Sequence, residues 1–236
     1  MTNKWLKVAL MVTAIATGTS IKIDAETVLY VPQDDRPVSL QYTVDTAREA
    51  GMTVLTPPQH LISGKTYQGQ ADQIMAWVEQ NAGRADVMVL STDTLIYGGL
   101  VDSRKHNIPL STLQNRLKRI EGLKARNKNV RIYGFGTVMR SPRASGGGTE
   151  PAYYAEYGPT IFQIAALQDK LDSGSLTQEE TQKLMSLQAS VPVEYLQDWF
   201  DRRQKNMKIN KELIDETRSG VFDYFALGHD DTSQLS

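Results

Sequence analysis

The stretch Val28–Ser39, VLYVPQDDRPVS, gives the clearest view of how this chain folds. Its first four residues are β-branched, aliphatic or aromatic, which is typical of a short buried strand. The chain then turns polar at once, with two adjacent carboxylates and an arginine, Asp34, Asp35 and Arg36. A buried strand that ends abruptly in charged residues is typical of a parallel sheet with a polar site at the carboxyl ends of its strands.

The same alternation of apolar strand and helix continues along the chain. Apolar runs predict four further strands, and residues three or four apart share apolar faces in the segments between them. The expected strands are Val28–Val31, Met52–Leu55, Asp86–Leu90, Val130–Tyr133 and Tyr224–Leu227, and the expected helices include Leu40–Ala50, Ala71–Asn81 and Leu110–Arg126. This alternation favours an α/β fold with right-handed crossovers. We expect part of a β/α barrel, with a doubly wound open sheet as the alternative.

A helical insertion, residues 151–220, interrupts this rhythm before the last strand. Thr177 and Glu180 form a capping-box pattern, and Pro192 is typical of the first turn of a long helix. Four apolar residues of that long helix keep to one face and are expected to pack in the core: Leu196, Phe200, Met207 and Ile214. Insertions of this kind commonly cover a site as a lid or a wall.

Residues 1–25 have the pattern of a secretory signal peptide. Lys4 and Lys7 precede the apolar run Val8–Ala16, and small and polar residues follow it. The run is shorter than the roughly 20 residues that a membrane-spanning helix needs. We therefore expect an exported protein, secreted or held in the cell envelope, with no stable membrane span after cleavage. The α/β domain covers residues 26–236 and is expected to be incomplete at its C-terminus, because no helix follows the last strand.

The composition narrows the classes of function. The 236 residues carry 26 basic and 27 acidic side chains, so the chain lacks the positive charge that a phosphate backbone attracts, and nucleic acid is not an expected partner. The absence of cysteine excludes disulfides and thiol chemistry, and three histidines disfavour a multi-histidine zinc site. Neither a glycine-rich nucleotide motif nor a Gly-x-Ser-x-Gly elbow occurs. The composition leaves the oligomeric state open.

Polar side chains collect where the strands are expected to end. The residues concerned are Asp34, Asp35 and Arg36 after the first strand, Asp93, Tyr97 and Arg104 after the third, Arg140 after the fourth, and His229, Asp230 and Asp231 after the fifth. Taken singly, each of them could belong to a turn or cap a helix. The carboxyl ends of parallel strands meet at one edge of a sheet, however, so these residues together predict a shared ligand site.

Carboxylates held close together can divide the work of acid and base, because like charges push their pKa values apart. Hydrolysis of a glycosidic bond uses such a pair. The sequence therefore predicts a hydrolase that acts on a small-molecule or glycan substrate without a cofactor. The expected catalytic carboxylates are Asp34, Asp35, Asp230 and Asp231. The residues expected to bind the substrate are Arg36, Asp93, Tyr97, Arg104, Arg140 and His229.

Two alternatives fit the same residues. The oxygen-rich set could hold Mg²⁺ or Mn²⁺, with the arginines binding phosphate, in a metal-dependent hydrolase of the phosphoesterase type. It could also hold a polar ligand without reacting with it. Metal dependence separates the first alternative from a glycosidase, and loss of binding rather than turnover separates a binding protein from an enzyme.

Four motifs in this chain resemble those of a known family. They are VPQDDRPVS (Val31–Ser39), DTLIYGGLVDSR (Asp93–Arg104), VMRSP (Val138–Pro142) and GHDDTSQ (Gly228–Gln234). On these motifs the chain resembles the bacterial proteins grouped as domain of unknown function 4127, from Thr27 to its end. The resemblance implies longer relatives and a shared site, and it implies no particular activity. Gln33 departs from the apolar residue that relatives more often carry.

Overall fold

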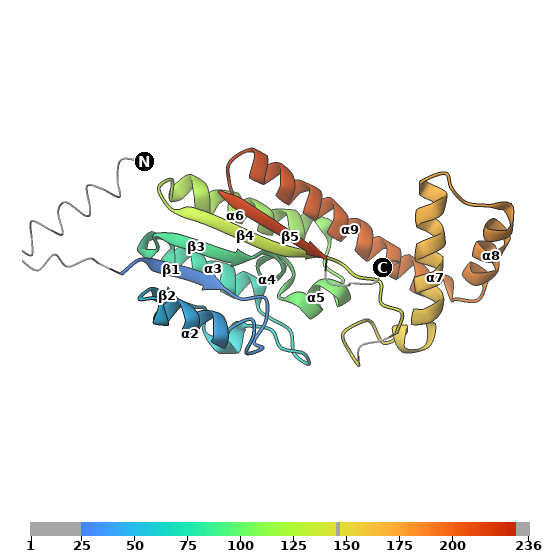
Figure 1. Ribbon diagram of the computed structural model, residues 1–236, viewed down its shortest axis with the longest axis horizontal. Coiled ribbons are helices and arrows are strands. Elements are labelled where there is room, and N and C mark those ends of the chain that lie inside the picture. Colours follow the sequence, from blue (N-terminus) through green and yellow to red (C-terminus); the bar gives the residue numbers. More distant parts are fainter. Residues whose placement is uncertain (1–24, 145–146, 230–236) are drawn as a thin grey trace, which may run out of the picture.

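The computed structural model describes residues 25–144 and 147–229, which are built around a five-stranded parallel sheet (Figure 1). The strands are β1 Thr27–Val31, β2 Thr53–Leu55, β3 Val87–Ser91, β4 Arg131–Val138 and β5 Tyr224–His229. Each pair of neighbouring strands is parallel, and helices alternate with strands along the chain. The expected α/β fold is confirmed. Asp230, Asp231 and all but the last residue of the expected signal peptide lie outside the described residues.

The strand order is β2-β1-β3-β4-β5. In a β/α barrel each strand lies beside the strands that precede and follow it in the chain, whereas here β1 lies between β2 and β3. The observed order is that of a doubly wound open sheet of the flavodoxin type. The described strands therefore favour the doubly wound alternative over the barrel. Sequence did not separate the two, because both alternate strands with helices and differ in the side of the sheet on which each crossover passes.

Three helices cover one face of the sheet. They are α3 (Ala71–Asn81), α6 (Leu110–Arg126) and α9 (Val193–Arg218), and they pack side by side. Alternate residues of the strands point to this face and form the main core with the helices. Fully buried members of this core include Leu29, Met88, Leu90, Ile132, Ile74, Ile120 and Ile209. This packing fixes the positions at which the central strands end.

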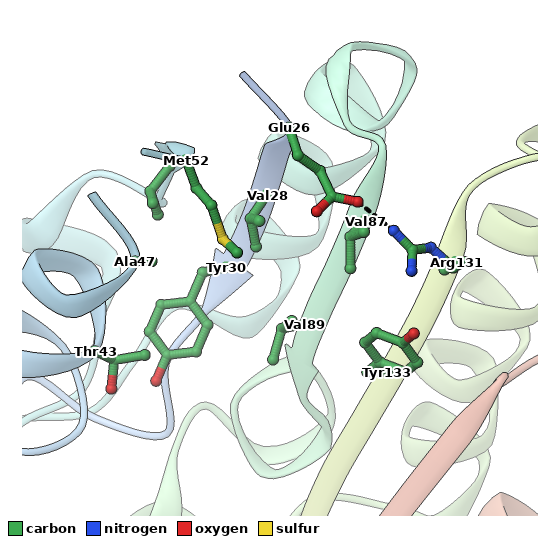
Figure 2. A pocket seen from close by; sticks show the side chains of 11 residues that line it. Glu26, Val28, Tyr30, Thr43, Ala47, Met52, Val87, Val89, Arg131 and Tyr133 are labelled. Carbon is green, nitrogen blue, oxygen red and sulfur yellow. Dashed lines mark hydrogen bonds and ion pairs between the residues drawn. The ribbon is translucent and has the colours of Figure 1, made fainter. Parts of the chain in front are cut away.

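The opposite face of the sheet is partly covered by α2 (Gln41–Glu49). A pocket of about 290 Å³ lies on this face, and Figure 2 shows the side chains that line it. The pocket is lined mainly by apolar side chains of the strands and of α2, among them Val28, Val89, Tyr133 and Ala47. An ion pair between Glu26 and Arg131 lies at its edge, near the amino ends of the strands. None of the residues that line this pocket is one of the candidate site residues.

Between β4 and β5 the chain forms α7 (Tyr154–Asp172), α8 (Gln178–Ala189) and α9. Helices α7 and α8 extend beyond the sheet (Figure 1) and share a second core with the start of α9. The expected capping box of α8 is confirmed, since the Thr177 hydroxyl accepts the backbone N–H of Glu180 and the Glu180 carboxylate accepts that of Thr177. Among the described residues, no helix is both long and apolar enough to cross a membrane.

The prediction that four apolar residues of α9 are buried is wrong for two of them. Met207 is 53% exposed and Ile214 36%, while Leu196 and Phe200 pack against the second core. The buried face instead consists of Trp199, Arg202, Asn206, Ile209 and Leu213. The two polar members of this face donate hydrogen bonds to main-chain carbonyls of a neighbouring segment. Such bonds make burial of a polar residue acceptable, and a hydrophobic pattern does not reveal them.

Candidate functional site

The loops after β1 and β3 meet at the carboxyl edge of the sheet and then diverge. After β1 the chain enters α2 on one face, and after β3 it forms α4 (Thr92–Tyr97), α5 (Leu100–Lys105) and then α6 on the other. In doubly wound sheets the crevice at such a switch point is where ligands bind. The polar residues at this edge, which we call the rim site, are Gln33, Asp34, Arg36, Asp93, Arg104, Thr137, Arg140 and Glu150.

Asp93 is a deeply buried acid of the rim site, with 2% of its surface exposed. It stands in the first turn of α4, directly after β3. Its Oδ2 accepts hydrogen bonds from Gln33 Nε2 at 2.8 Å and from Thr137 Oγ1 at 2.9 Å. Burial raises the pKa of Asp93 to about 6, although these bonds and the charge of Arg104 act in the opposite direction. Asp93 is therefore partly protonated near neutral pH.

Thr94 joins the segments after β1 and β3. Its hydroxyl donates to the carbonyl of Pro32 at 2.7 Å and lies 3.2 Å from the carbonyl of Gln33. The Ser91 side chain caps α4 by accepting the N–H of Thr94. These buried bonds hold Gln33 and Asp93 in contact across the crevice.

Asp34 is buried and forms an ion pair with Arg36. Its Oδ2 lies 2.7 Å from both Nε and a terminal nitrogen of Arg36, and its Oδ1 accepts the Arg36 N–H at 3.2 Å. The Arg36 side chain is 53% exposed. The carboxylate thus anchors a guanidinium that reaches into solvent.

Asp35 has different surroundings from its neighbour in the chain. Its carboxylate accepts a hydrogen bond from the hydroxyl of Tyr67, and its N–H donates to the carbonyl of Ser63 at 2.9 Å. The hydrogen bond to Asp35 raises the pKa of Tyr67. The described contacts therefore join Asp35 to the loop around Tyr67, and not to Asp93 or its hydrogen-bond donors.

Arg104 and Arg140 share a buried carboxylate, Glu150, that the sequence analysis did not identify. The Oε1 of Glu150 lies 2.6 Å from a terminal nitrogen of Arg140 and 3.8 Å from one of Arg104. Thr149 donates to the other oxygen of Glu150 at 2.8 Å. Burial lowers the pKa of Arg104 to about 10, and the charge of Arg140 acts in the same direction. Glu150 precedes α7 without a strand or a recognisable motif beside it, so no sequence signal marked it.

Tyr97 lies in the interior, below the rim site. Its ring stacks on that of His106 at 4.9 Å, and its hydroxyl is buried without a hydrogen-bond partner among the residues described. The Nδ1 of His106 accepts the N–H of Ile108 at 3.3 Å, so Nε2 carries the proton and donates to Asn206 Oδ1 at 2.7 Å. Burial lowers the pKa of His106 to about 4, which keeps the ring neutral. Tyr97 thus contacts His106, and an exposed stacking surface is not formed.

His229 is exposed at the end of β5, opposite Val138 of β4. Asp230 and Asp231 follow it outside the described residues. The structure thus brings together Asp34, Arg36, Asp93, Arg104 and Arg140 at one edge, with Asp35 directed to another loop. Within residues 25–144 and 147–229, no three histidine, aspartate or glutamate side chains are grouped so that they could hold a metal ion. Carboxyl groups and guanidinium groups at this edge can bind hydroxyls or anions.

Residues 28–236 match the family described as Protein of unknown function (DUF4127). This match covers the sheet, the helical insertion and the whole rim site. No curated protein and no solved structure matches the chain. On the extent of the family match, the chain belongs to the DUF4127 family.

Proposed function

We propose that this protein is an exported hydrolase that acts on a carbohydrate at the rim site. In this proposal Asp230 and Asp231 supply the acid and the base, and Asp34 and Asp35 assist them or position the substrate, Asp34 from within the rim site and Asp35 from the adjoining loop beside Tyr67. The two aspartates directly follow His229 in the chain, and β5 is the strand next to β4. The fifth strand therefore leads to the same edge of the sheet as the strands before the rim site.

The observation that carries the proposal is the contrast between two buried carboxyl groups after neighbouring strands. Asp93 has its pKa raised to about 6 by burial, whereas Asp34 is held by two close contacts with the Arg36 guanidinium. Glycosidases need one group that keeps its proton and another that stays ionised. The crevice between β1 and β3 thus holds one buried carboxyl group with a raised pKa, Asp93, and one carboxylate paired with an arginine, Asp34, and the proposal places the substrate beside both.

The arginines supply the groups that would bind the sugar. Arg36 and Arg140 are the more accessible ones, with 53% and 22% of their side chains exposed, whereas only 5% of the surface of Arg104 is exposed. A guanidinium is a planar set of donors that can bond neighbouring hydroxyls or a carboxylate. Glu150 fixes the direction of Arg140 through its contact of 2.6 Å.

Export belongs to the same proposal and is supported by residues 1–25. A positively charged start, an apolar run and small residues before Glu26 fit a cleaved secretory signal. N-terminal sequencing of protein recovered outside the cytoplasm tests this part directly. A mature chain that begins near Glu26 is the expected result, and a full-length chain confined to the cytoplasm would contradict it.

The test of the activity uses the full chain and a panel of soluble polysaccharides. We expect reducing ends to be released from at least one of them. The double variant Asp230→Asn with Asp231→Asn should lower kcat by a factor of about 100 or more, the scale of a lost acid–base pair, while the substrate still binds. The matched control, Asp45→Asn with Asp201→Asn, changes two exposed carboxylates away from the rim site and should leave kcat unchanged.

Two results would overturn the glycosidase proposal. The first is full turnover in the double variant. The second is activity on phosphate esters that disappears on chelation and returns with Mg²⁺ or Mn²⁺, which would indicate metal-assisted hydrolysis instead.

A further inference from the structure

A second hollow follows the outer face of α9, and we call it the α9 groove. It has a volume of about 1020 Å³ and is lined by residues of α7, by Gln188 of α8, by the face of α9 between Val193 and Ile214, by the end of β4 and by Leu227 of β5. Binding sites for small ligands typically have volumes of about 300 to 1,000 Å³. The α9 groove is therefore larger than a single sugar ring requires.

Carboxamide side chains are frequent in the lining of the groove. They include Gln168, Gln188, Gln197, Gln204 and Asn210. A carboxamide offers both donors and an acceptor, and a sugar hydroxyl likewise donates and accepts, so the two groups are suited to each other. The charged residues of the lining balance, with Asp169 and Asp172 opposed by Arg203 and Lys211. This balance does not favour a polyanion such as a nucleic acid.

Apolar surface alternates with the carboxamides along the groove. Phe200 is partly buried, while Val193 is 73% exposed and Met207 is exposed as well. An amphipathic ligand with C–H faces and hydroxyl edges matches such an alternation, because its C–H faces cover the apolar surface while its hydroxyls bond to the carboxamides.

The groove adjoins the segment of the chain that carries Arg140 of the rim site. Val138 and Met139 line it and directly precede Arg140 of the rim site. Arg203, in the wall of the groove, donates 2.8 Å hydrogen bonds to the Met139 carbonyl and the Ser141 hydroxyl. One residue of α9 therefore holds both sides of the segment that carries Arg140.

From this adjacency and from the lining we propose that the α9 groove binds the chain of a neutral oligosaccharide whose end lies at the rim site. The class of ligand rests on the proposed function, but binding in the groove does not require turnover. The helical insertion then extends the site along α9, so that affinity depends on the length of the glycan.

The experiment is calorimetric titration of the full chain with β-1,4-linked oligomers of glucose, N-acetylglucosamine and xylose, from monomer to hexamer. The groove variant is Gln197→Ala with Gln204→Ala, two exposed residues of α9. We expect one hexamer to bind at least about tenfold more tightly than its monomer. In the groove variant this hexamer should lose about tenfold in affinity, while the weak affinity for the monomer stays the same.

The control variant is Gln163→Ala with Gln182→Ala, exposed carboxamides of α7 and α8 that do not line the groove. It should bind every oligomer as the wild type does. The proposal is contradicted if no oligomer of the panel binds, if affinity is independent of length, or if the groove variant binds the hexamer as tightly as the wild type. Length-dependent binding without any hydrolysis product in the titrated sample would overturn the proposed function and leave the groove proposal standing.

Discussion

Charged side chains are exposed at the amino edge of the sheet, whereas several are buried at its carboxyl edge. At the amino edge, Glu26 and Arg131 form an ion pair, and their side chains are 41% and 52% exposed, respectively. At the carboxyl edge, Asp93, Arg104 and Glu150 are almost completely buried. Water screens the first kind of pair, so it contributes little to stability, whereas buried charges lose their hydration and depend on their partners.

The buried charges indicate that the carboxyl edge is the functional edge of the sheet, because burial of charge costs stability. Burial of charge without function is unusual, and perturbed titratable groups gather at functional sites. Substitutions of similar chemistry should therefore have large effects at the carboxyl edge and small ones at the amino edge.

The largest effect is expected for Glu150→Ala. The change removes a buried partner from both Arg104 and Arg140, and loss of one side of a buried ion pair typically costs about 3 to 5 kcal/mol. Urea unfolding of the variant measures the loss. Glu194→Ala, at an exposed position of α9, is the control and should change the free energy of unfolding by less than about 0.5 kcal/mol. Equal midpoints for the two variants would show that Glu150 is not a structural anchor.

A comparable effect is expected from the pH dependence of stability through Asp93. Its pKa is raised from 3.8 to about 6 in the folded protein, so its contribution is fully present below about pH 4 and is lost as the pH rises through about 6. Relative to Asp93→Asn, which does not titrate, the wild type should lose about 2 kcal/mol of stability between about pH 4 and pH 7. Urea unfolding across this range checks the loss, and a constant difference between the two proteins would contradict it.

A smaller effect is expected for Thr137→Val, which removes one of the two donors to Asp93 Oδ2. Loss of this bond should destabilise the protein by about 1 kcal/mol and raise the pKa of Asp93 further, because the Thr137 bond lowers it. Titration of the carboxyl carbon by NMR reads the pKa. Thr66→Val, on an exposed loop, is the control. An unchanged or lower pKa in Thr137→Val would rule out the hydrogen bond as a contributor.

The smallest effect is expected at the amino edge, for Arg131→Ala. Both partners of this pair are exposed, so the change in free energy of unfolding should be within about 0.5 kcal/mol and should shrink further in salt. Thermal unfolding at low and high ionic strength measures it. A loss as large as that of Glu150→Ala would remove the difference between the two edges.

The sequence predicted the elements that have a local pattern of their own, such as an apolar run, a helical period or a capping motif. The apolar strand of Val28–Val31, the 3.6-residue period of Leu110–Arg126 and the capping box at Thr177 all appear in the structure as expected. Polar residues at strand ends led to Asp34 and Asp93 because parallel strands bring these ends together.

The remaining features depend on tertiary contacts that leave no local signal. The position of β1 between β2 and β3 depends on the face of the sheet along which each connecting helix packs. Glu150 becomes a buried partner through folding of a loop with no periodic pattern. The inward face of α9 is partly polar because Asn206 bonds to a carbonyl on another segment. Gln33, which sequence left without a role, is a donor to Asp93.

The central claim is that side chains after separate strands form one ligand site at the carboxyl edge. A crystal structure of the full chain soaked with the tightest-binding oligosaccharide tests it most directly. We expect a sugar ring in contact with Arg36 and Arg140, with further rings along α9. Sugar bound in the apolar pocket near Tyr133, with the carboxyl edge unoccupied, would contradict the claim.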